Sequence, residues 1–486
     1  MTSAFDPKRA QRSEPDAALT LIAQYASEPP PVSALALESA RHCLMDTLAC
    51  GLLALKVPAC ARLIGPVVPG AVMPGGARVP GTSLELDPVQ GAFAIGTMIR
   101  WLDFNDTWLA AEWGHPSDNL GGILAVADYL SRQALMHGRA SLTVADVLTA
   151  MIRAHEIQGV LALNNSFNRV GLDHVLLVRV ATTAVVTAML GGSQEQICNA
   201  VSNAWADGGA LRVYRHAPNT GSRKSWAAGD ATSRGVRHAL LAMSGEMGYP
   251  TVLTAPRWGF QDVLFAGQTL ALPQPFGSYV MENILFKISF PAEFHAQTAV
   301  ECALALHEVV RDRLDAVSSI MIETQEPGVR IIDKTGPLAN PADRDHCIQY
   351  MVAVPLIFGR LSAADYEDEV AADPRIDRLR ALMEVRENEG FTKDYYDPER
   401  RFIGNAVQVF FKDGSATPRV HVDYPVGHRL RRAEGLPLMV GKFEAAVRAH
   451  YPAKQAARVV ALFADPARLA ALTVNEFMAE LVSNGR

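Results

Sequence analysis

The residues best suited to chemistry lie between tryptophans in two neighbouring segments. Residues 101–108 read W-L-D-F-N-D-T-W, and residues 113–119 read W-G-H-P-S-D-N. A partly desolvated pocket needs this mixture, because its walls must exclude water while a few acid, hydroxyl and imidazole groups contact the ligand. We therefore interpret the two segments as the floor of an active site. The alternative is a surface loop in which Asp and Asn form turns and the tryptophans cover the core.

The second segment leads into an expected helix. Asp118 and Asn119 precede an apolar run at 120–127, which is the pattern of a polar N-cap. His115 would then lie just ahead of a helix N-terminus. Free backbone N–H groups and the positive end of the helix dipole favour an anionic ligand there.

His155 is the next candidate. It lies on the same face of an expected helix as Met151 and Ile152, so the apolar stripe points it inward. An inward imidazole near a polar cluster can bind an anion or move a proton at neutral pH. The alternative is a core histidine whose hydrogen bonds are satisfied.

Lys224 has an unfavourable position unless it binds an anion. The segment 219–229 (N-T-G-S-R-K-S-W-A-A-G) predicts a turn followed by a helix that carries Lys224 in or near its first turn. A cation there adds to the positive potential of the dipole, so a bound carboxylate or phosphate would explain it. A solvated surface lysine is the alternative.

Three further candidates lie beyond residue 280. Lys287 and His295 flank a proline turn that opens a helix, and they could close over a ligand. Caps and charges that serve folding alone are the alternative for both. Tyr350 lies on an expected helix that starts near Asp343 and could turn its hydroxyl inward, although core packing is the commoner role.

The common nucleotide, zincin and serine-hydrolase motifs are absent from the sequence. It has no Walker loop, no G-x-G-x-x-G behind a strand, no H-E-x-x-H and no G-x-S-x-G. The remaining His, Lys, Asp and Thr groups, with no metal and no cofactor, suit proton transfer next to carboxylates. Cations would lower the cost of an enolate-like carbanion while an imidazole or amine moves the proton.

Composition indicates a large globular protein. The chain has 486 residues, 49% of them hydrophobic, and a net charge of −6, which argues against nucleic acid as the main partner. The locally basic stretch 212–224 is expected to face a small anion. No apolar run approaches the length of a membrane helix, and residues 1–16 resemble neither a signal peptide nor a transit peptide. The six cysteines form no C-x-x-C pair and are expected to be mostly buried thiols in a reducing cytoplasm.

Periodicity predicts a mainly α fold. Residues 15–275 show helical periods, with capping boxes that begin at Thr143 and Ser193. Helical signals return after residue 435, with a further capping box at Thr473.

A smaller α+β unit is expected between these helical parts. Strands are predicted at 317–324, 405–411 and 417–424, the last two joined by a D-G hairpin signal, and a helix is predicted from 294 to about 314. The simplest architecture is a large all-helical domain, made of residues 1–275 and 429–486, with an inserted α+β lid domain at 276–428.

The chain resembles the MmgE/PrpD family over nearly its full length. The most specific parts are D-F-N-D-T at 103–107 with H-P-S at 115–117, Lys224 in T-G-S-R-K, and the segment 287–295. The resemblance implies a helical domain with an α+β lid, a dimer, and an active site between domain and lid. It also implies reversible loss of water from 2-methylcitrate, giving 2-methyl-cis-aconitate in propionate breakdown, without an iron–sulfur cluster or other cofactor.

The resemblance also implies the residues of the pocket. The catalytic candidates are Asp103, Thr107, His115, His155 and Lys224, and the substrate-binding candidates are Lys287, His295 and Tyr350. Arg223, which precedes Lys224, is added to the substrate-binding candidates from the sequence and not from the resemblance. In this hypothesis Lys224, His155 and the lid residues hold the carboxylates. His115 moves the proton, and Asp103 orients His115 with help from Thr107.

Other functions remain open at this point. The same pocket would suit dehydration of citrate, decarboxylation of cis-aconitate, or epimerisation of an amino-dicarboxylate derivative, since the last two also begin or end at a carbon next to a carboxylate. A helical protein that binds a metabolite without turnover is the non-enzymatic alternative.

Overall fold

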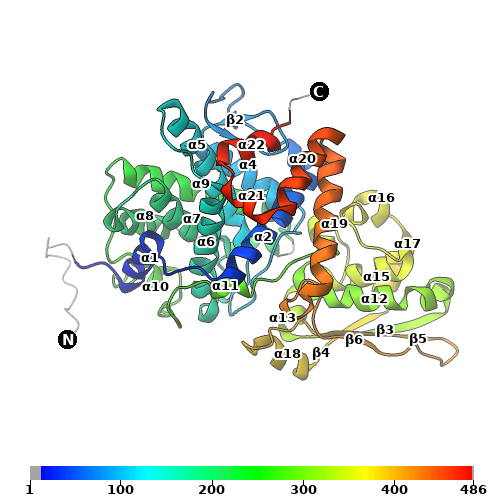
Figure 1. Cartoon of the computed structure of the whole chain (residues 1–486). Helices are drawn as coiled ribbons and strands as arrows, with labels where there is room; N and C mark the ends of the chain where they lie inside the picture. Colours follow the sequence, from blue (N-terminus) through cyan, green and yellow to red (C-terminus); the bar gives the residue numbers. More distant parts are fainter. Residues whose placement is uncertain (1–12, 208, 217, 484–486) are drawn as a thin grey trace.

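The computed structural model describes residues 13–207, 209–216 and 218–483, and it confirms a mainly α fold (Figure 1). The helical body contains α-helices and short 3-10 helices, the latter marked η. These are α1 (Ala17–Ser27), α2 (Ala34–Ala54), α3 (Pro58–Ala61), α4 (Pro88–Arg100), η1 (Pro116–Asn119), α5 (Leu120–Met136), α6 (Val144–Asn164), η2 (Asn168–Val170), α7 (Val175–Met189), α8 (Gln194–Ala206), η3 (Arg212–Arg215), α9 (Arg223–Met243), α10 (Phe260–Val263) and α11 (Tyr279–Glu282). A two-stranded hairpin of β1 (Ala77–Arg78) and β2 (Glu85–Leu86) lies between α3 and α4.

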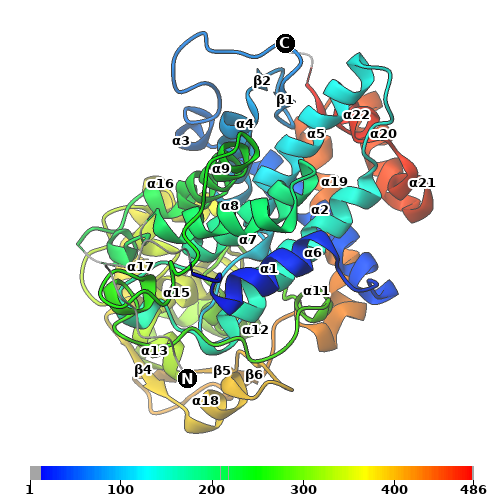
Figure 2. The same ribbon diagram turned by 90° about the vertical axis from the view of Figure 1, so that its left-hand side faces the viewer.

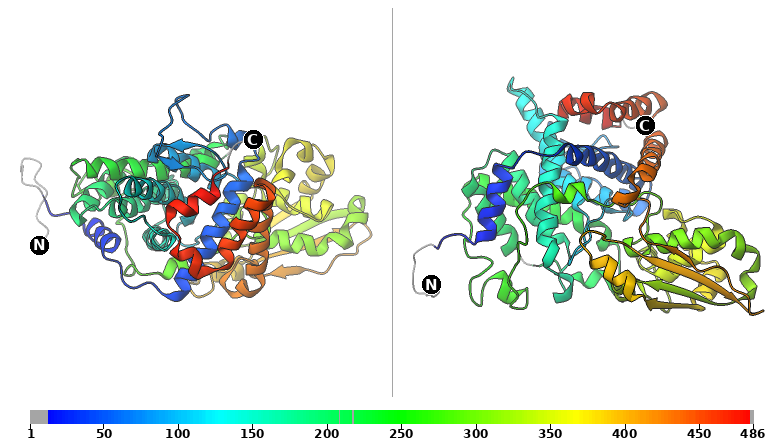
Figure 3. Two further views of the ribbon diagram at one scale, coloured as in Figure 1. Left: turned by 45° about the horizontal axis from the view of Figure 1, so that its top comes forward. Right: turned by 60° about the horizontal axis from the view of Figure 1, so that its bottom comes forward.

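The C-terminal helices belong to the same body. They are η7 (Arg429–Arg431), α19 (Arg432–His450), α20 (Ala453–Ala464), α21 (Pro466–Ala471) and α22 (Val474–Leu481). Helix α19 packs beside α2, and α21 and α22 pack on α6 and α5 (Figure 3). Met439 and Phe443 of α19 share a hydrophobic core with Leu44 and Leu48 of α2. The C-terminal helices therefore pack in the same core as the N-terminal ones.

The α+β unit has its own core and one mixed sheet. Its helices are η4 (Phe294–Ala296), α12 (Gln297–Val310), η5 (Arg311–Ala316), α13 (Glu326–Ile332), α14 (Pro341–Arg344), α15 (Ile348–Phe358), η6 (Ala363–Tyr366), α16 (Asp368–Ala371), α17 (Pro374–Arg380) and α18 (Glu389–Tyr396). Its strands are β3 (Val317–Thr324), β4 (Met383–Glu387), β5 (Asn405–Phe411) and β6 (Val420–Val422), in the order β4-β3-β5-β6. Helices α12 and α15 lie on one face of this sheet (Figure 1).

The sheet confirms part of the sequence prediction. The first two predicted strands are β3 and β5, with Ile320 opposite Val409 in an antiparallel pair. The third is shorter than predicted, because only 420–422 form a regular ladder with β5. Strand β4 was not predicted. It is an exposed edge strand that runs parallel to β3, and its sequence M-E-V-R-E lacks a strong apolar signal.

Several helix starts were predicted correctly, and one cap was not. The capping boxes at Thr143, Ser193 and Thr473 are all present. The helix after residue 119 begins as predicted, but Asn119 does not cap it, because its amide donates to Gln158 and accepts from Thr182. A 3-10 turn, η1, provides the entry into α5 instead.

Glycines bring together the helices that carry the site. Helix α4 crosses α9 at Gly96 and Gly229, where a Cβ on Gly96 would lie 2.8 Å from the Cα of Gly229. This close approach brings Arg100, the last residue of α4, and Lys224, in the first turn of α9, to the same region of the body. Figure 2 shows α9 beside α7 and α8.

The described helices do not include one with the length and hydropathy of a membrane span. Residues from Val280 to Ile288 pack in the helical core, whereas Phe290 packs in the core of the α+β unit. The division into residues 1–275, 276–428 and 429–486 stays a prediction.

Candidate active site

A polar cavity lies between the helical body and the α+β unit. Its walls come from the end of α4 and the loop that follows, the start of α7, η3, and three segments of the α+β side. The lining residues are Arg100, Asp103, Thr107, Leu109, Trp113, His115, His174, Arg212, Arg215, Lys287, Glu293, Phe294, His295, Ile331 and His346. Both tryptophan-rich segments therefore contribute to it, and the helix containing Arg100 leads directly into the first.

Asp103 is the shared partner of two cations of this cavity, Arg100 and Lys287. Its carboxylate accepts from Arg100 Nη1 at 2.6 Å and from Lys287 Nζ, and its backbone carbonyl accepts from Lys287 at 2.9 Å. Its φ of +48° is a left-handed value that Asp tolerates better than most side chains do. Burial alone would raise the pKa of Asp103, but Arg100 and Lys287 hold it well below its ordinary value. The carboxylate is therefore ionised.

His115 is held in one tautomer by its neighbours. Nδ1 lies 2.6 Å from the Asp106 carbonyl oxygen, which can only accept, so Nδ1 carries the proton. Nε2 lies 2.9 Å from Arg100 Nη2, which can only donate, so Nε2 presents its lone pair. Burial and the cations Arg100 and Lys287 lower the pKa of His115 well below its ordinary value. The ring is neutral and can act as a base.

Thr107 ties the His115 loop to the other side of the cavity. Its hydroxyl lies 3.4 Å from His115 Nδ1, and its backbone exchanges hydrogen bonds with Leu285, two residues before Lys287. This pairing between Thr107 and Leu285 brings Lys287 close to Asp103.

His155 lies behind the site, which corrects its predicted place in the pocket. The apolar stripe does point it inward, but its Nε2 lies 2.9 Å from the Asp106 carboxylate and its Nδ1 lies 2.8 Å from the Met151 carbonyl oxygen. Asp106 also accepts from the backbone and hydroxyl of Ser117. His155 thus fixes Asp106, whose backbone carbonyl orients His115.

Cys43, Asp106 and His155 could in principle share a metal ion. Cys43 Sγ lies 3.6 Å from both the Asp106 carboxylate and His155 Nε2, and all three side chains are buried. These contacts serve as hydrogen bonds within the group, and we assign no metal to it.

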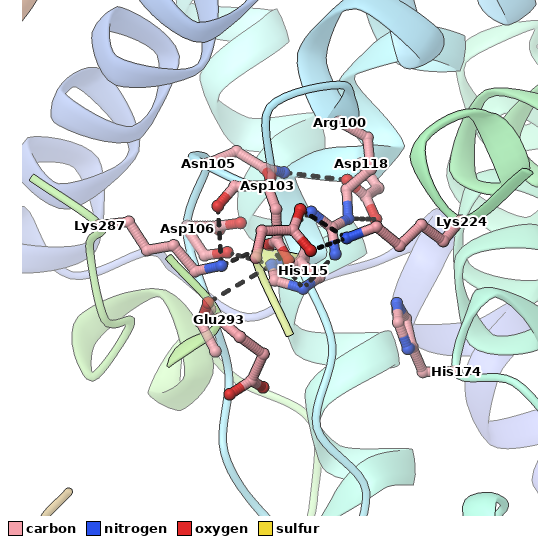
Figure 4. Close-up of polar contacts among 12 residues, drawn as sticks. Arg100, Asp103, Asn105, Asp106, His115, Asp118, His174, Lys224, Lys287 and Glu293 are labelled. Carbon is pink, nitrogen blue, oxygen red and sulfur yellow. Dashed lines mark hydrogen bonds and ion pairs between the residues drawn. The ribbon is translucent and has the colours of Figure 1, made fainter. Parts of the chain in front are cut away.

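Lys224, in the first turn of α9, lies next to the cavity and contacts His346, which lines it. Its Nζ donates to the Asp345 carboxylate at 2.6 Å and lies 3.1 Å from His346 Nδ1. Burial lowers the pKa of Lys224, and Asp345 opposes this shift. Figure 4 shows Lys224 and Lys287 approaching the Asp103–His115 group from opposite sides. The sequence predicted that Lys224 binds an anion, and in the structure this anion is the carboxylate of Asp345.

The α+β side contributes His295 as predicted. Its Nδ1 lies 2.8 Å from Glu293, and its Nε2 lies 3.1 Å from the Tyr395 hydroxyl. Burial would raise the pKa of Glu293, but His295 holds it at about 2. Both residues line the cavity, so this wall carries an ionised carboxylate.

Two predicted substrate-binding residues lie outside the cavity, which corrects their assignment. Tyr350 donates its hydroxyl to the Asp365 carbonyl at 2.6 Å and lines a different hollow, together with Arg344 and Asp377. Arg223 has a 44% exposed side chain that stacks on Trp226 at 4.3 Å. Neighbouring residues on a helix point in different directions, so Arg223 cannot follow Lys224 into the site.

His174 is the main site residue that sequence reasoning missed. Neither ring nitrogen has a hydrogen-bond partner within the described residues, although Nδ1 lies 3.4 Å from the Asp173 carboxylate. Its ring centroid lies 5.6 Å from that of His115, and burial lowers its pKa well below the ordinary value. The available signal was the Asp-His pair directly before the apolar run at 175–189.

Three arginines were also missed as individual candidates. Arg100 ends an otherwise apolar helix, and Arg212 and Arg215 belong to the basic stretch that was expected to face a small anion. All three are buried and line the cavity. Together with Lys287 they outnumber the lining carboxylates of Asp103 and Glu293, so the site suits a small polyanion.

Comparison with known proteins shows which family the chain resembles over most of its length. The MmgE/PrpD N-terminal domain matches residues 20–273, and the MmgE/PrpD C-terminal domain matches residues 290–465. The chain is 61% identical to a 2-methylcitrate dehydratase of Cupriavidus necator, covering 97% of this chain and 98% of that protein. It is 60% identical to a 2-methylcitrate dehydratase of Escherichia coli, covering 96% and 97%, and 58% identical to a mitochondrial one of Yarrowia lipolytica, covering 93% and 87%.

Proposed function

The chain belongs to the MmgE/PrpD family, and from this premise we propose that it is a hydro-lyase that eliminates water from 2-methylcitrate to give 2-methyl-cis-aconitate. The proton leaves the carbon that bears the methyl group and a carboxylate, and the hydroxyl group leaves the neighbouring carbon. The C–H and C–O bonds break, a C=C bond forms, and the proton and hydroxide leave as water.

The neutral, buried imidazole of His115 carries this proposal. Its Nε2 lone pair is the available base in a cavity with an excess of cations. A carboxylate next to the reacting carbon would attract Arg100 and Lys287, and this would release Nε2 from Arg100. The same cations would stabilise the enolate-like charge that develops as the proton leaves.

Lys224 would hold a second carboxylate of the substrate. In the structure its partner is Asp345, which lies on the α+β side of the cavity. A substrate carboxylate would replace Asp345 on Lys224, so binding would require the α+β unit to shift relative to α9. His174 would contact the substrate next to His115, because its ring nitrogens have no hydrogen-bond partner among the described residues.

The proposal is tested by the ultraviolet absorbance of the conjugated product. Enzyme prepared with chelator is mixed with separate 2-methylcitrate stereoisomers, and with citrate as a second substrate. A rise with one 2-methylcitrate isomer supports the dehydratase. Release of carbon dioxide from cis-aconitate, inversion without alkene formation, or tight binding without turnover would instead support the decarboxylase, the epimerase or a binding protein.

The place of His155 behind the site predicts how its loss affects kinetics. His155→Gln should lower kcat and reduce the free energy of unfolding by about 3 kcal/mol, because it breaks the buried contact between His155 Nε2 and the Asp106 carboxylate. KM for 2-methylcitrate should not change, since His155 does not face the cavity. Steady-state kinetics and thermal melting measure both effects, with the exposed His137→Gln as the control. A raised KM would show that His155 contributes to substrate binding, contrary to this prediction.

We also propose that the enzyme acts as a cytoplasmic homodimer in propionate breakdown. The relatives' names support the metabolic role, and the free cysteines, five of them buried, agree with a reducing compartment. Light scattering coupled to gel filtration tests the dimer directly, and a monomer mass would overturn it.

A further inference from the structure

Arg212 differs from the other cations of the cavity in how its charge is satisfied. Arg100 and Lys287 both bind Asp103, and Arg215 forms two hydrogen bonds with Asp173. The guanidinium of Arg212 makes no hydrogen bond to any described residue, and its buried Nη1 lies 3.7 Å from Asp173. The Arg212 side chain is 94% buried, and its guanidinium therefore has at least one donor, Nη1, without a hydrogen-bond partner among the described residues.

The nearby carboxylates do not complete the shell of Arg212. Asp173 already receives Arg215, which takes both of its oxygens. Glu112 is the other acid close enough to affect Arg212, but it forms no ion pair with it among the described residues, and its Oε2 accepts from Asn168. Arg212 therefore has one long ion pair, with Asp173, and no hydrogen bond to a carboxylate among the described residues. Burying a guanidinium without such hydrogen bonds is costly, so the arrangement favours an anion supplied by a ligand.

Arg212 is fixed in position on the cavity wall. Its backbone N–H donates to the Gly171 carbonyl at 2.9 Å, and its guanidinium lies over the Trp113 ring at 5.4 Å. Both Arg212 and Trp113 line the cavity. A planar fork held against an aromatic face is well suited to bind a carboxylate through two hydrogen bonds.

We propose that Arg212 binds a third carboxylate of the substrate and makes the site selective for tricarboxylates over dicarboxylates. The inference rests on the proposed function, which assigns one carboxylate to Arg100 and Lys287 and another to Lys224. The third carboxylate of a tricarboxylate then still needs a cationic partner. Among the described residues that line the cavity, Arg212 is the arginine or lysine that has no hydrogen-bonded carboxylate. Arg212 thus determines specificity without taking part in proton transfer.

Two inert ligands that differ by one carboxylate test this role. Tricarballylate has three carboxylates and no hydroxyl group to eliminate, and glutarate is the same carbon chain without the central carboxylate. Calorimetry on the full-length protein gives the ratio of the glutarate Kd to the tricarballylate Kd. Arg212→Gln should lower this ratio by about 10- to 100-fold, the range expected for lost charged hydrogen bonds. Arg212→Lys, which keeps the buried charge, should lower it by less.

Arg330 provides a matched control. Its guanidinium also lies 5.4 Å from the Trp113 ring, but it pairs with Glu326 and does not line the cavity. Arg330→Gln should leave the ratio unchanged. An unchanged ratio in folded Arg212→Gln and Arg212→Lys, or equal weakening of both ligands, would overturn the role of Arg212 even if the wild type dehydrates 2-methylcitrate. A lowered ratio with no wild-type dehydration would support Arg212 and overturn only the proposed reaction.

Discussion

Replacing His115 with Gln is expected to lower kcat by about 10²- to 10⁴-fold, the contribution of a positioned general base. The amide of Gln could still donate to the Asp106 carbonyl and so preserve the loop, but it cannot accept a proton from carbon. The protein should therefore remain folded with a similar melting temperature. Steady-state rates with 2-methylcitrate measure the effect, and His421→Gln, on a partly exposed histidine of the sheet, is the control. Near wild-type turnover by His115→Gln would show that His115 is not the general base.

The pH dependence of the wild type follows from the same group. The pKa of His115 is lowered well below its ordinary value, and the neutral form is the base. The working form therefore persists as the pH falls through about 6.5, where an ordinary histidine becomes protonated. We expect kcat/KM to decline only at lower pH. A decline centred on the ordinary histidine pKa would contradict the burial of this imidazole beside Arg100 and Lys287.

Replacing Asp103 with Asn should have the second large effect, on stability as well as on turnover. Asn tolerates the left-handed backbone at this position, so the substitution removes the charge with little strain. It leaves Arg100 and Lys287 buried without their carboxylate, and breaking such a pair costs about 3–5 kcal/mol of unfolding free energy. The two cations would also lose their fixed positions, so turnover should fall.

The Asp103 prediction is measured by denaturant unfolding and steady-state kinetics. Asp315→Asn is the control, because the Asp315 side chain is 91% exposed and its pair with Arg378 is solvated. Unchanged stability in Asp103→Asn would show that Asp103 is not the anchor of the buried cations.

Local patterns in the sequence were sufficient to predict the residues that lie close together along the chain. Asp103, Thr107 and His115 fall within one loop, and the position of Lys224 in a helix N-terminus signalled an anionic partner. That partner proved to be Asp345, more than a hundred residues away, which no local pattern reveals.

His155 and Tyr350 lie outside the cavity for the same physical reason. Helical periodicity predicts that His155 and Tyr350 face inward, but it does not say which interior they face. His155 meets Asp106 behind the cavity, and Tyr350 meets Asp365 within the α+β unit. His174 was missed for the converse reason, because the cavity that gives it a role is assembled from segments far apart in sequence.

The fold shows the same division between local and distant information. Capping boxes predicted three helix starts, and the D-G signal predicted the hairpin of β5 and β6. Strand β4 depends on β3 for its hydrogen bonds and has a largely charged, exposed sequence, so only the tertiary structure reveals it.

The most direct test of the account is proton NMR of single 2-methylcitrate stereoisomers incubated with the wild-type enzyme and chelator. Loss of the proton next to the methyl group should convert the methyl doublet into a singlet, while all three carboxylates remain in the product. This result with one isomer, and its absence with His115→Gln, is what the neutral base in a cationic cavity predicts. A persistent doublet with every isomer, or a product that has lost a carboxylate, would contradict it.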